Sequence, residues 1–171
     1  MIFQSIKTSR LKKDQISQII KLKNTYWDYG KNSQIKWFNK NAYPNDLHNL
    51  LLIKRKIIGY TFLGKRFYLT KNNKKRYILF SSLILNKKYR KFKYASKFMN
   101  FNNKVIKKRK IISFLYCDKN KVKFYKYFGW ITLNKSMFKV PDHKSKQIGM
   151  VFNLKKSKTF LNTSLKFYYH L

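Results

Sequence analysis

The segment from Asn86 to Ala95 has the residue types and the position of a phosphate-binding turn. It follows an apolar run at residues 79–85, which reads as a strand, and leads into a helical pattern that begins at about Lys93. The N-terminus of a helix presents unpaired backbone N–H groups and a partial positive charge, and Arg90 adds a full charge beside it. We therefore expect this turn to bind a phosphate group. The alternative is a basic turn that binds nothing.

A second segment with reactive chemistry runs from Asp118 to Trp130. It follows another apolar run, at residues 111–117, and has the pattern of a short helix that Gly129 ends. The phenol of Tyr125 keeps its proton near neutral pH, so it can act as a general acid, although an ordinary core tyrosine is the alternative. The order strand, helix, strand, helix predicts two parallel neighbouring strands joined by a right-handed crossover.

The first segment resembles the pyrophosphate loop of the GNAT acyltransferases, which transfer an acetyl group from acetyl-CoA to an amine. The family pattern is Arg/Gln-x-x-Gly-x-Gly/Ala, and Arg90 takes its first position, Lys93 replaces its middle glycine and Ala95 takes its last. If the loop needs a positive φ at the middle position, Lys93 strains the backbone. If it needs only an N–H group, Lys93 adds a cation instead.

The second segment resembles another GNAT pattern, Asn-x-x-Ala-hydrophobic-x-x-Tyr-x-x-x-Gly-aromatic. Tyr125, Gly129 and Trp130 match it, whereas Asp118 and Lys121 replace the usual Asn and Ala. The family's Asn contacts the cofactor, but a carboxylate is a poor neighbour for phosphate. We therefore expect Asp118 to cap the following helix.

The resemblance implies an α/β fold whose mixed, mostly antiparallel sheet has about seven strands flanked by helices. It covers residues 1–154 as one acetyltransferase domain and leaves residues 155–171 as a basic and aromatic C-terminal extension, which covers the sheet, joins a homodimer or binds a partner. It implies acetyl-CoA as co-substrate, no metal, and direct attack by a small-molecule or peptide amine within a ternary complex. A backbone N–H near Leu85 would stabilise the oxyanion, and Tyr125 would protonate the leaving thiolate. The implied cofactor-binding residues are Leu83, Ile84, Leu85, Asn86, Arg90, Lys91, Phe92, Lys93, Tyr94, Ala95, Ser96, Asp118 and Tyr125.

The general base is harder to identify, because the sequence contains no Glu. His48 opens a predicted strand and has an unperturbed pKa of about 6.5, which suits a base, although a lone histidine is usually structural. The other candidates are Asp28, Asp46, His143 and a water relayed to backbone carbonyls.

The charge of the chain is extreme. Lys and Arg number 41 against 5 Asp and Glu, which gives a formal net charge of +36. Such a surface attracts nucleic acid, acidic membranes or CoA itself, although a solvated lysine surface is the plainer interpretation. The alternative function is therefore a non-catalytic protein of this fold, or another basic protein, that binds RNA or a ribonucleoprotein through residues 87–110.

Cys117 is the only cysteine, so no disulfide forms within the chain and no zinc site is built from cysteines. No run of roughly 18 apolar residues predicts a membrane-spanning helix, and the N-terminus does not resemble a secretory signal. These features predict a cytoplasmic protein.

The remaining pattern predicts short strands and two early helices. Thr8 or Ser9 is expected to cap the first helix and Gly30 to end it, and a second helix is expected at residues 34–41. The predicted strands are residues 2–7, 48–53, 57–63, 77–85, 131–138 and 147–154.

Overall fold

The computed structural model describes residues 1–71, 73–142, 145–154 and 165–170. The chain forms two compact units, the first from Met1–Gly64 and Phe80–Asn102 and the second from Lys65–Leu79 and Asn103–Leu171. The units alternate along the sequence because three long elements contribute residues to both. These are strand β3 (Lys56–Leu69), strand β4 (Lys74–Leu85) and helix α3 (Phe92–Lys108).

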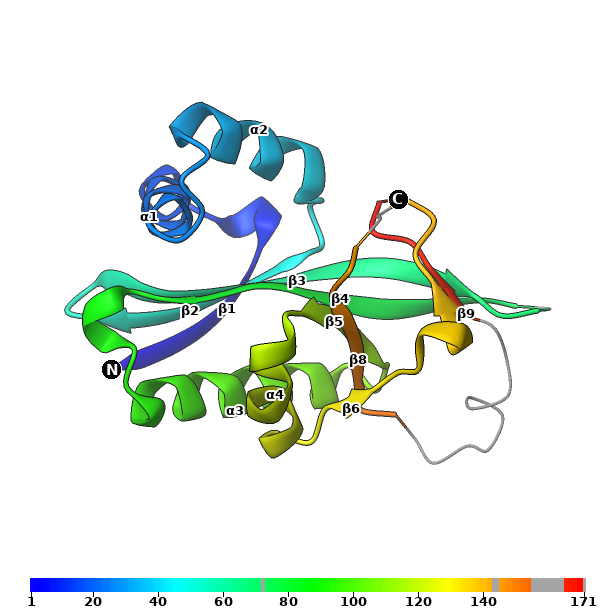
Figure 1. The fold of residues 1–171 in the computed structure, drawn as a ribbon. Coiled ribbons are helices and arrows are strands. Elements are labelled where there is room, and N and C mark those ends of the chain that lie inside the picture. The colour runs from blue at the N-terminus through cyan, green and yellow to red at the C-terminus, as the bar shows by residue number, and fades with distance from the viewer. Residues whose placement is uncertain (72, 143–144, 155–164, 171) are drawn as a thin grey trace. The chain divides into compact units, whose positions relative to one another are not determined.

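The first unit is a sheet with helices on both faces (Figure 1). Strands β1 (Ile2–Lys7) and β2 (Leu47–Ile53) are antiparallel neighbours, and β2 is antiparallel to β3, which is followed by β4. Helices α1 (Lys13–Asn24) and α2 (Lys31–Asn41) lie on one face, and the first turns of α3 lie on the other.

Alternation along β2 explains why both faces of this sheet are covered. Successive side chains of a strand point to opposite faces, and all of β2 except its last residue is buried. Leu50 packs in a cluster with Ile19 and Leu22 of α1. Its neighbour Leu51 packs with Phe98 of α3 in a second cluster. Each fully buried leucine contributes about 2 kcal/mol of hydrophobic stabilisation.

The second unit contains the parallel strand pair predicted from the sequence. Strand β5 (Ser113–Cys117) runs parallel to the start of β4, with Ile78 opposite Ser113 and Leu79 opposite Phe114. Strand β8 (Ile148–Phe152) is antiparallel to β5, and β6 (Ile131–Thr132) is antiparallel to β8. Helix α4 (Val122–Tyr127) ends just before Gly129, whose φ of +81° confirms its predicted role.

Two further short strands belong to this unit. Strand β7 (Phe138–Lys139) runs parallel to β9 (Leu165–Phe167), and β9 is antiparallel to the end of β3. Leu165 and Phe167 of β9 are fully buried in a cluster with Tyr77 and other aromatic residues. Part of the expected C-terminal extension is therefore a strand of the second unit, whereas residues 155–164 lie outside the described residues. The domain boundary at residue 154 stays a prediction.

The predicted α/β class and the mostly antiparallel sheet are confirmed, with nine strands in the described residues where about seven were expected. The strand predicted at residues 131–138 is interrupted. It consists of β6, the 3₁₀ turn η4 (Lys135–Met137) and β7. The side-chain oxygen of Asn134 accepts a hydrogen bond from the Ser136 N–H at 3.3 Å, which stabilises this turn.

Two helix-end predictions are wrong. Helix α1 ends at Asn24, and Gly30, with a φ of +78°, directly precedes α2. The chain turns earlier because the Thr25 hydroxyl donates to the Leu22 carbonyl at 2.7 Å. Neither Thr8 nor Ser9 caps the first helix, because the N-cap of α1 is Lys12. The Thr8 hydroxyl instead contacts Nε2 of His48 at 2.9 Å.

Candidate functional site

The turn between β4 and α3 lies entirely within the first unit. The Asn86 N–H donates to the Ile58 carbonyl at 2.8 Å, which fixes the end of β4 against β3. The Asn86 side chain then accepts from the Lys88 N–H at 3.1 Å and starts the 3₁₀ turn η2 (Lys87–Tyr89). The side-chain cap and the short turn bring the chain to the N-terminus of α3 without a glycine.

The Arg90 side chain is held at this turn by two contacts. Its Nε donates to the Leu85 carbonyl at 3.0 Å, and its guanidinium carbon lies 5.2 Å from the centre of the Tyr26 ring, within cation–π range. Arg90 is nevertheless exposed to solvent. The turn therefore carries a positioned, solvent-accessible guanidinium at the end of β4.

The first turn of α3 supplies backbone donors beside Arg90. The Lys91 carbonyl accepts from the Tyr94 and Ala95 N–H groups at 3.0 and 3.2 Å. Within the described part of the chain, the N–H groups of Lys91 and Lys93 have no hydrogen-bond acceptor. Unpaired donors of this kind at a helix N-terminus suit a phosphate oxygen.

Lys93 does not strain the backbone at the position of the missing glycine. It lies in α3 and is not among the residues with positive φ. The turn therefore requires no left-handed conformation at this position. The Lys93 side chain is exposed and adds a cation to the turn.

The structure brings most of the predicted cofactor-binding residues to this one place. Leu83, Ile84 and Leu85 lead into the turn as the last residues of β4. Ile84 packs with the α1 side of the sheet, whereas Leu83 and Leu85 pack with the α3 side. The other members of the group are Asn86 and Arg90 in the turn and Lys91, Phe92, Lys93, Tyr94, Ala95 and Ser96 at or beside the start of α3.

A backbone feature that was not expected from the sequence lies three residues before the end of β4. Ser82 has a φ of +61°, a left-handed conformation that is rare for a residue other than glycine inside a strand. Such a residue is typical of a β-bulge, where the ladder of a strand is interrupted and its peptide groups are redirected. The two adjacent serines, Ser81 and Ser82, in an apolar strand were the available signal.

His48, the predicted base, is fully buried in the first unit. Its Nε2 lies 2.9 Å from the Thr8 hydroxyl and its Nδ1 lies 3.0 Å from the Tyr60 hydroxyl. Burial, with a smaller contribution from the charge of Lys23, lowers the pKa of His48 to about 3. The imidazole is neutral and both nitrogens are engaged, which favours a packing role, and the catalytic role stays a prediction.

A buried lysine lies close to His48 and was not expected from the sequence. Lys23 of α1 is 3% exposed, and its Nζ lies 3.1 Å from the centre of the Trp37 ring of α2. Within the described residues the Lys23 ammonium has neither a hydrogen-bond partner nor a carboxylate partner. Removal from water lowers the pKa of Lys23 to about 7.

The second predicted motif lies in the second unit. Tyr125 is half-buried on α4, and its ring lies edge-on to Trp130 with the ring centres 6.0 Å apart. The expectation that Asp118 caps the next helix is wrong, because its carboxylate instead accepts from the Gln147 side chain at 2.8 Å. The catalytic role of Tyr125 and the cofactor contact of Asp118 stay predictions.

The other candidate bases are dispersed. Asp46 is buried and accepts from the Tyr43 N–H at 2.9 Å, whereas Asp28 is exposed and accepts from the Asn24 side chain at 3.3 Å. His143 lies outside the described residues. Within the described ranges, no three His, Cys, Asp or Glu side chains gather as a metal site. No helix of that same part of the chain is both long and apolar enough to span a membrane.

Comparison with known proteins identifies the fold. No family model matches the sequence. The search of curated proteins also finds no match. Solved structures do match. Escherichia coli ElaA is similar over 88% of this chain and 97% of its own, with a TM-score of 0.67 and 15% identity. An aminoglycoside 6'-N-acetyltransferase complexed with coenzyme A matches 92% of this chain and 100% of its own, with a TM-score of 0.69 and 13% identity.

A GNAT-family acetyltransferase from Staphylococcus aureus matches 90% of this chain and 100% of its own, with a TM-score of 0.60 and 14% identity. The chain has the GNAT fold. The resemblance of two short motifs predicted this fold, and the structural matches confirm it over most of the chain.

Proposed function

We propose that this protein is an N-acetyltransferase that uses acetyl-CoA as its co-substrate. The observation that carries the proposal is the β4–α3 turn, where exposed Arg90 and unpaired N–H groups of Lys91 and Lys93 gather in a chain of GNAT fold. Solved proteins of this fold include an acetyltransferase complexed with coenzyme A.

The residues of the turn fit an anionic cofactor. The Lys91 and Lys93 N–H groups would donate to phosphate oxygens, and Arg90 would add a charge-assisted hydrogen bond. Bound acetyl-CoA would supply an activated acetyl thioester. The left-handed Ser82 would redirect a peptide N–H of β4, which is the kind of donor that stabilises an oxyanion. Tyr125 is proposed to donate a proton to the departing thiolate.

The proton of the attacking amine is proposed to leave to water. The chain has no Glu, His48 is buried and neutral, and Asp46 is buried and hydrogen-bonded to the backbone. A solvent water can accept a proton from an amine whose own pKa is close to neutral, so no dedicated carboxylate is needed.

The net charge narrows the class of acceptor. A chain of net charge +36 repels polycations, so a polycationic antibiotic is a poor acceptor for it on electrostatic grounds. We therefore propose an acceptor whose amine is carried by a neutral or anionic molecule.

The test is release of free CoA from acetyl-CoA in the presence of a panel of amines, detected with a thiol reagent. The protein gives little background, because burial and the nearby charge of Asp118 raise the pKa of Cys117, its only cysteine, to about 11. We expect amine-dependent release with a neutral or anionic amine, weaker release with an aminoglycoside, and loss of release in Tyr125→Phe. Absence of release with every amine, in a folded sample that binds acetyl-CoA, would contradict the catalytic proposal.

A further inference from the structure

The hairpin formed by β3 and β4 carries a cluster of cations and aromatic rings within the second unit. At 14 and 12 residues, β3 and β4 are the longest strands of the described structure. The end of β3 pairs with β9, which in turn pairs with β7 (Figure 1). This cluster shares no residue with the β4–α3 turn.

Strand alternation places these side chains on one face. Phe67 of β3 stacks on Tyr168, with the ring centres 4.7 Å apart, and the Tyr168 N–H donates to the Phe67 carbonyl at 3.1 Å. The ammonium of Lys74 lies over the Phe67 ring, 4.0 Å from its centre. Arg76 lies two residues after Lys74 and is therefore on the same face of β4.

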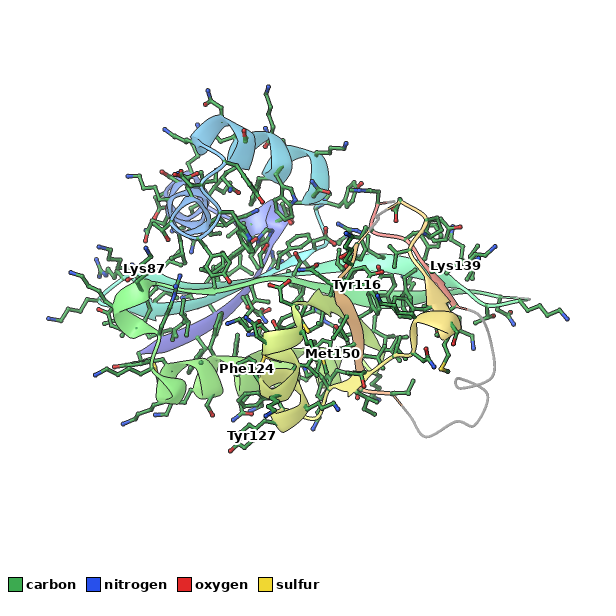
Figure 2. The ribbon with its side chains drawn as sticks, viewed as in Figure 1. Lys87, Tyr116, Phe124, Tyr127, Lys139 and Met150 are labelled. Carbon is green, nitrogen blue, oxygen red and sulfur yellow. The ribbon has the colours of Figure 1, made fainter. Side chains whose placement is uncertain are left out.

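Two more lysines continue this face. Lys166 of β9 lies opposite Leu69 of β3. Leu69 is two residues from Phe67, and Lys166 is two residues from Tyr168, so all of them lie on the same face of the strands. Lys139 of β7 lies directly opposite Lys166 (Figure 2 labels Lys139). All four cations are exposed, and we call these four cations with Phe67 and Tyr168 the hairpin face. Like charges directly opposite each other on neighbouring strands destabilise a sheet unless an anion offsets them.

No acidic side chain of the four strands offsets these cations. Strands β3, β4, β7 and β9 contain neither Asp nor Glu. Asp142 follows β7 in the sequence, but its carboxylate accepts from the backbone N–H groups of Tyr169 and His170 at 2.9–3.1 Å. Within the part of the chain that the structure describes, none of the four cations of the hairpin face is paired with a carboxylate, and the four surround two stacked rings.

We propose that the hairpin face binds single-stranded nucleic acid. Lysine and arginine side chains bind the phosphate backbone, and an aromatic ring between them provides a surface on which a base stacks. Because the Phe67 ring is already in contact with Lys74 and Tyr168, Tyr168 is the ring that we expect to stack on a base. A membrane surface fits less well. The rings of Phe67 and Tyr168 are only partly exposed, and none of the exposed large hydrophobic residues of the described structure belongs to the hairpin face, so little apolar surface is available to enter the lipid.

The test is fluorescence anisotropy of a labelled 12-nucleotide RNA, and of the DNA of the same sequence, across a salt series. With four phosphate contacts, the plot of log affinity against log salt should have a slope of about −3. The double variant Lys139→Gln, Lys166→Gln should bind about 10-fold more weakly at low salt, with a slope shallower by about 1.4. Tyr168→Leu keeps an apolar side chain but removes stacking, and should weaken binding by about 10-fold.

The matched control is Lys36→Gln, Lys40→Gln on α2, which removes the same charge from exposed positions in the first unit. It should change affinity by less than about 2-fold. Equal losses in the control and the hairpin variant would overturn the proposal, because overall charge would then explain the binding. Tighter binding to duplex RNA than to single strands, or to phosphatidylserine vesicles than to either nucleic acid, would also overturn it. A preference between RNA and DNA identifies which nucleic acid the face selects.

Discussion

Replacing Lys23 by methionine should stabilise the protein, and the gain should depend on pH. The Lys23 side chain is 3% exposed, and burial lowers its pKa from 10.5 to about 7. Between pH 7 and pH 10.5 the unfolded chain therefore binds a proton at this site that the folded protein has largely released. The free energy of unfolding of the wild type thus rises with pH across this window. Below pH 7 it is lowered by the full cost of burying the charged amine.

The magnitude follows from the shift. A displacement of 3.5 pKa units, from 10.5 to about 7, corresponds to a cost of about 5 kcal/mol for folding with the charged amine. Lys23→Met keeps an aliphatic side chain against the Trp37 ring and removes this cost. At pH 7 the buried amine is about half protonated, so we expect a gain of about 4 kcal/mol in the free energy of unfolding.

Urea unfolding at several pH values measures this effect. The stability difference between Lys23→Met and the wild type should narrow by about 1.4 kcal/mol for each pH unit between pH 7.5 and 9.5. Lys21→Met, an exposed position on the same helix, is the control for loss of a lysine. A destabilised Lys23→Met protein, or a difference that stays constant over this range, would refute the burial argument.

Three further substitutions test individual features of the structure. Ser82→Val should reduce the free energy of unfolding by about 2 kcal/mol in urea melts, because a β-branched side chain resists positive φ. Ser82→Gly should change the free energy of unfolding by less than about 1 kcal/mol. Equal effects of the two substitutions would contradict a left-handed conformation of Ser82 in β4. Gly149→Ala should cost about 3 kcal/mol, because its Cβ would overlap the ring of Phe138, and a neutral result by thermal unfolding would show that this contact is wrong. Asp142→Ala should lower the free energy of unfolding by about 1 kcal/mol, because its carboxylate accepts hydrogen bonds from the Tyr169 and His170 N–H groups. The substitution should also speed amide hydrogen exchange at those two residues. Unchanged exchange rates would contradict these hydrogen bonds.

The parts of the fold that the sequence predicted depend on local signals. Gly129 has the positive φ expected of a glycine after a helix, and β5 runs parallel to β4 as the strand–helix–strand order requires. The turn after β4 was predicted because its basic residues lie in the sequence directly between a strand pattern and a helix pattern. These features need no knowledge of distant residues.

The parts that sequence reasoning missed depend on tertiary contacts. Thr8 was expected to cap a helix, but folding brings its hydroxyl to His48, forty positions away in the sequence. Lys23 has the sequence context of an ordinary surface lysine, but in the folded chain it is buried and its ammonium lies over the Trp37 ring of α2. Lys93 differs from the family motif, yet its helical conformation shows that this difference costs no backbone strain.

The most direct test of the central proposal is calorimetric binding of acetyl-CoA at moderate salt. We expect micromolar binding that is lost in the double variant Arg90→Ala, Lys93→Glu. Binding should be retained in Lys36→Ala, Lys40→Glu, which changes the net charge by the same amount on α2. Absence of binding by the folded wild type, or equal loss in both double variants, would contradict a cofactor site at the β4–α3 turn.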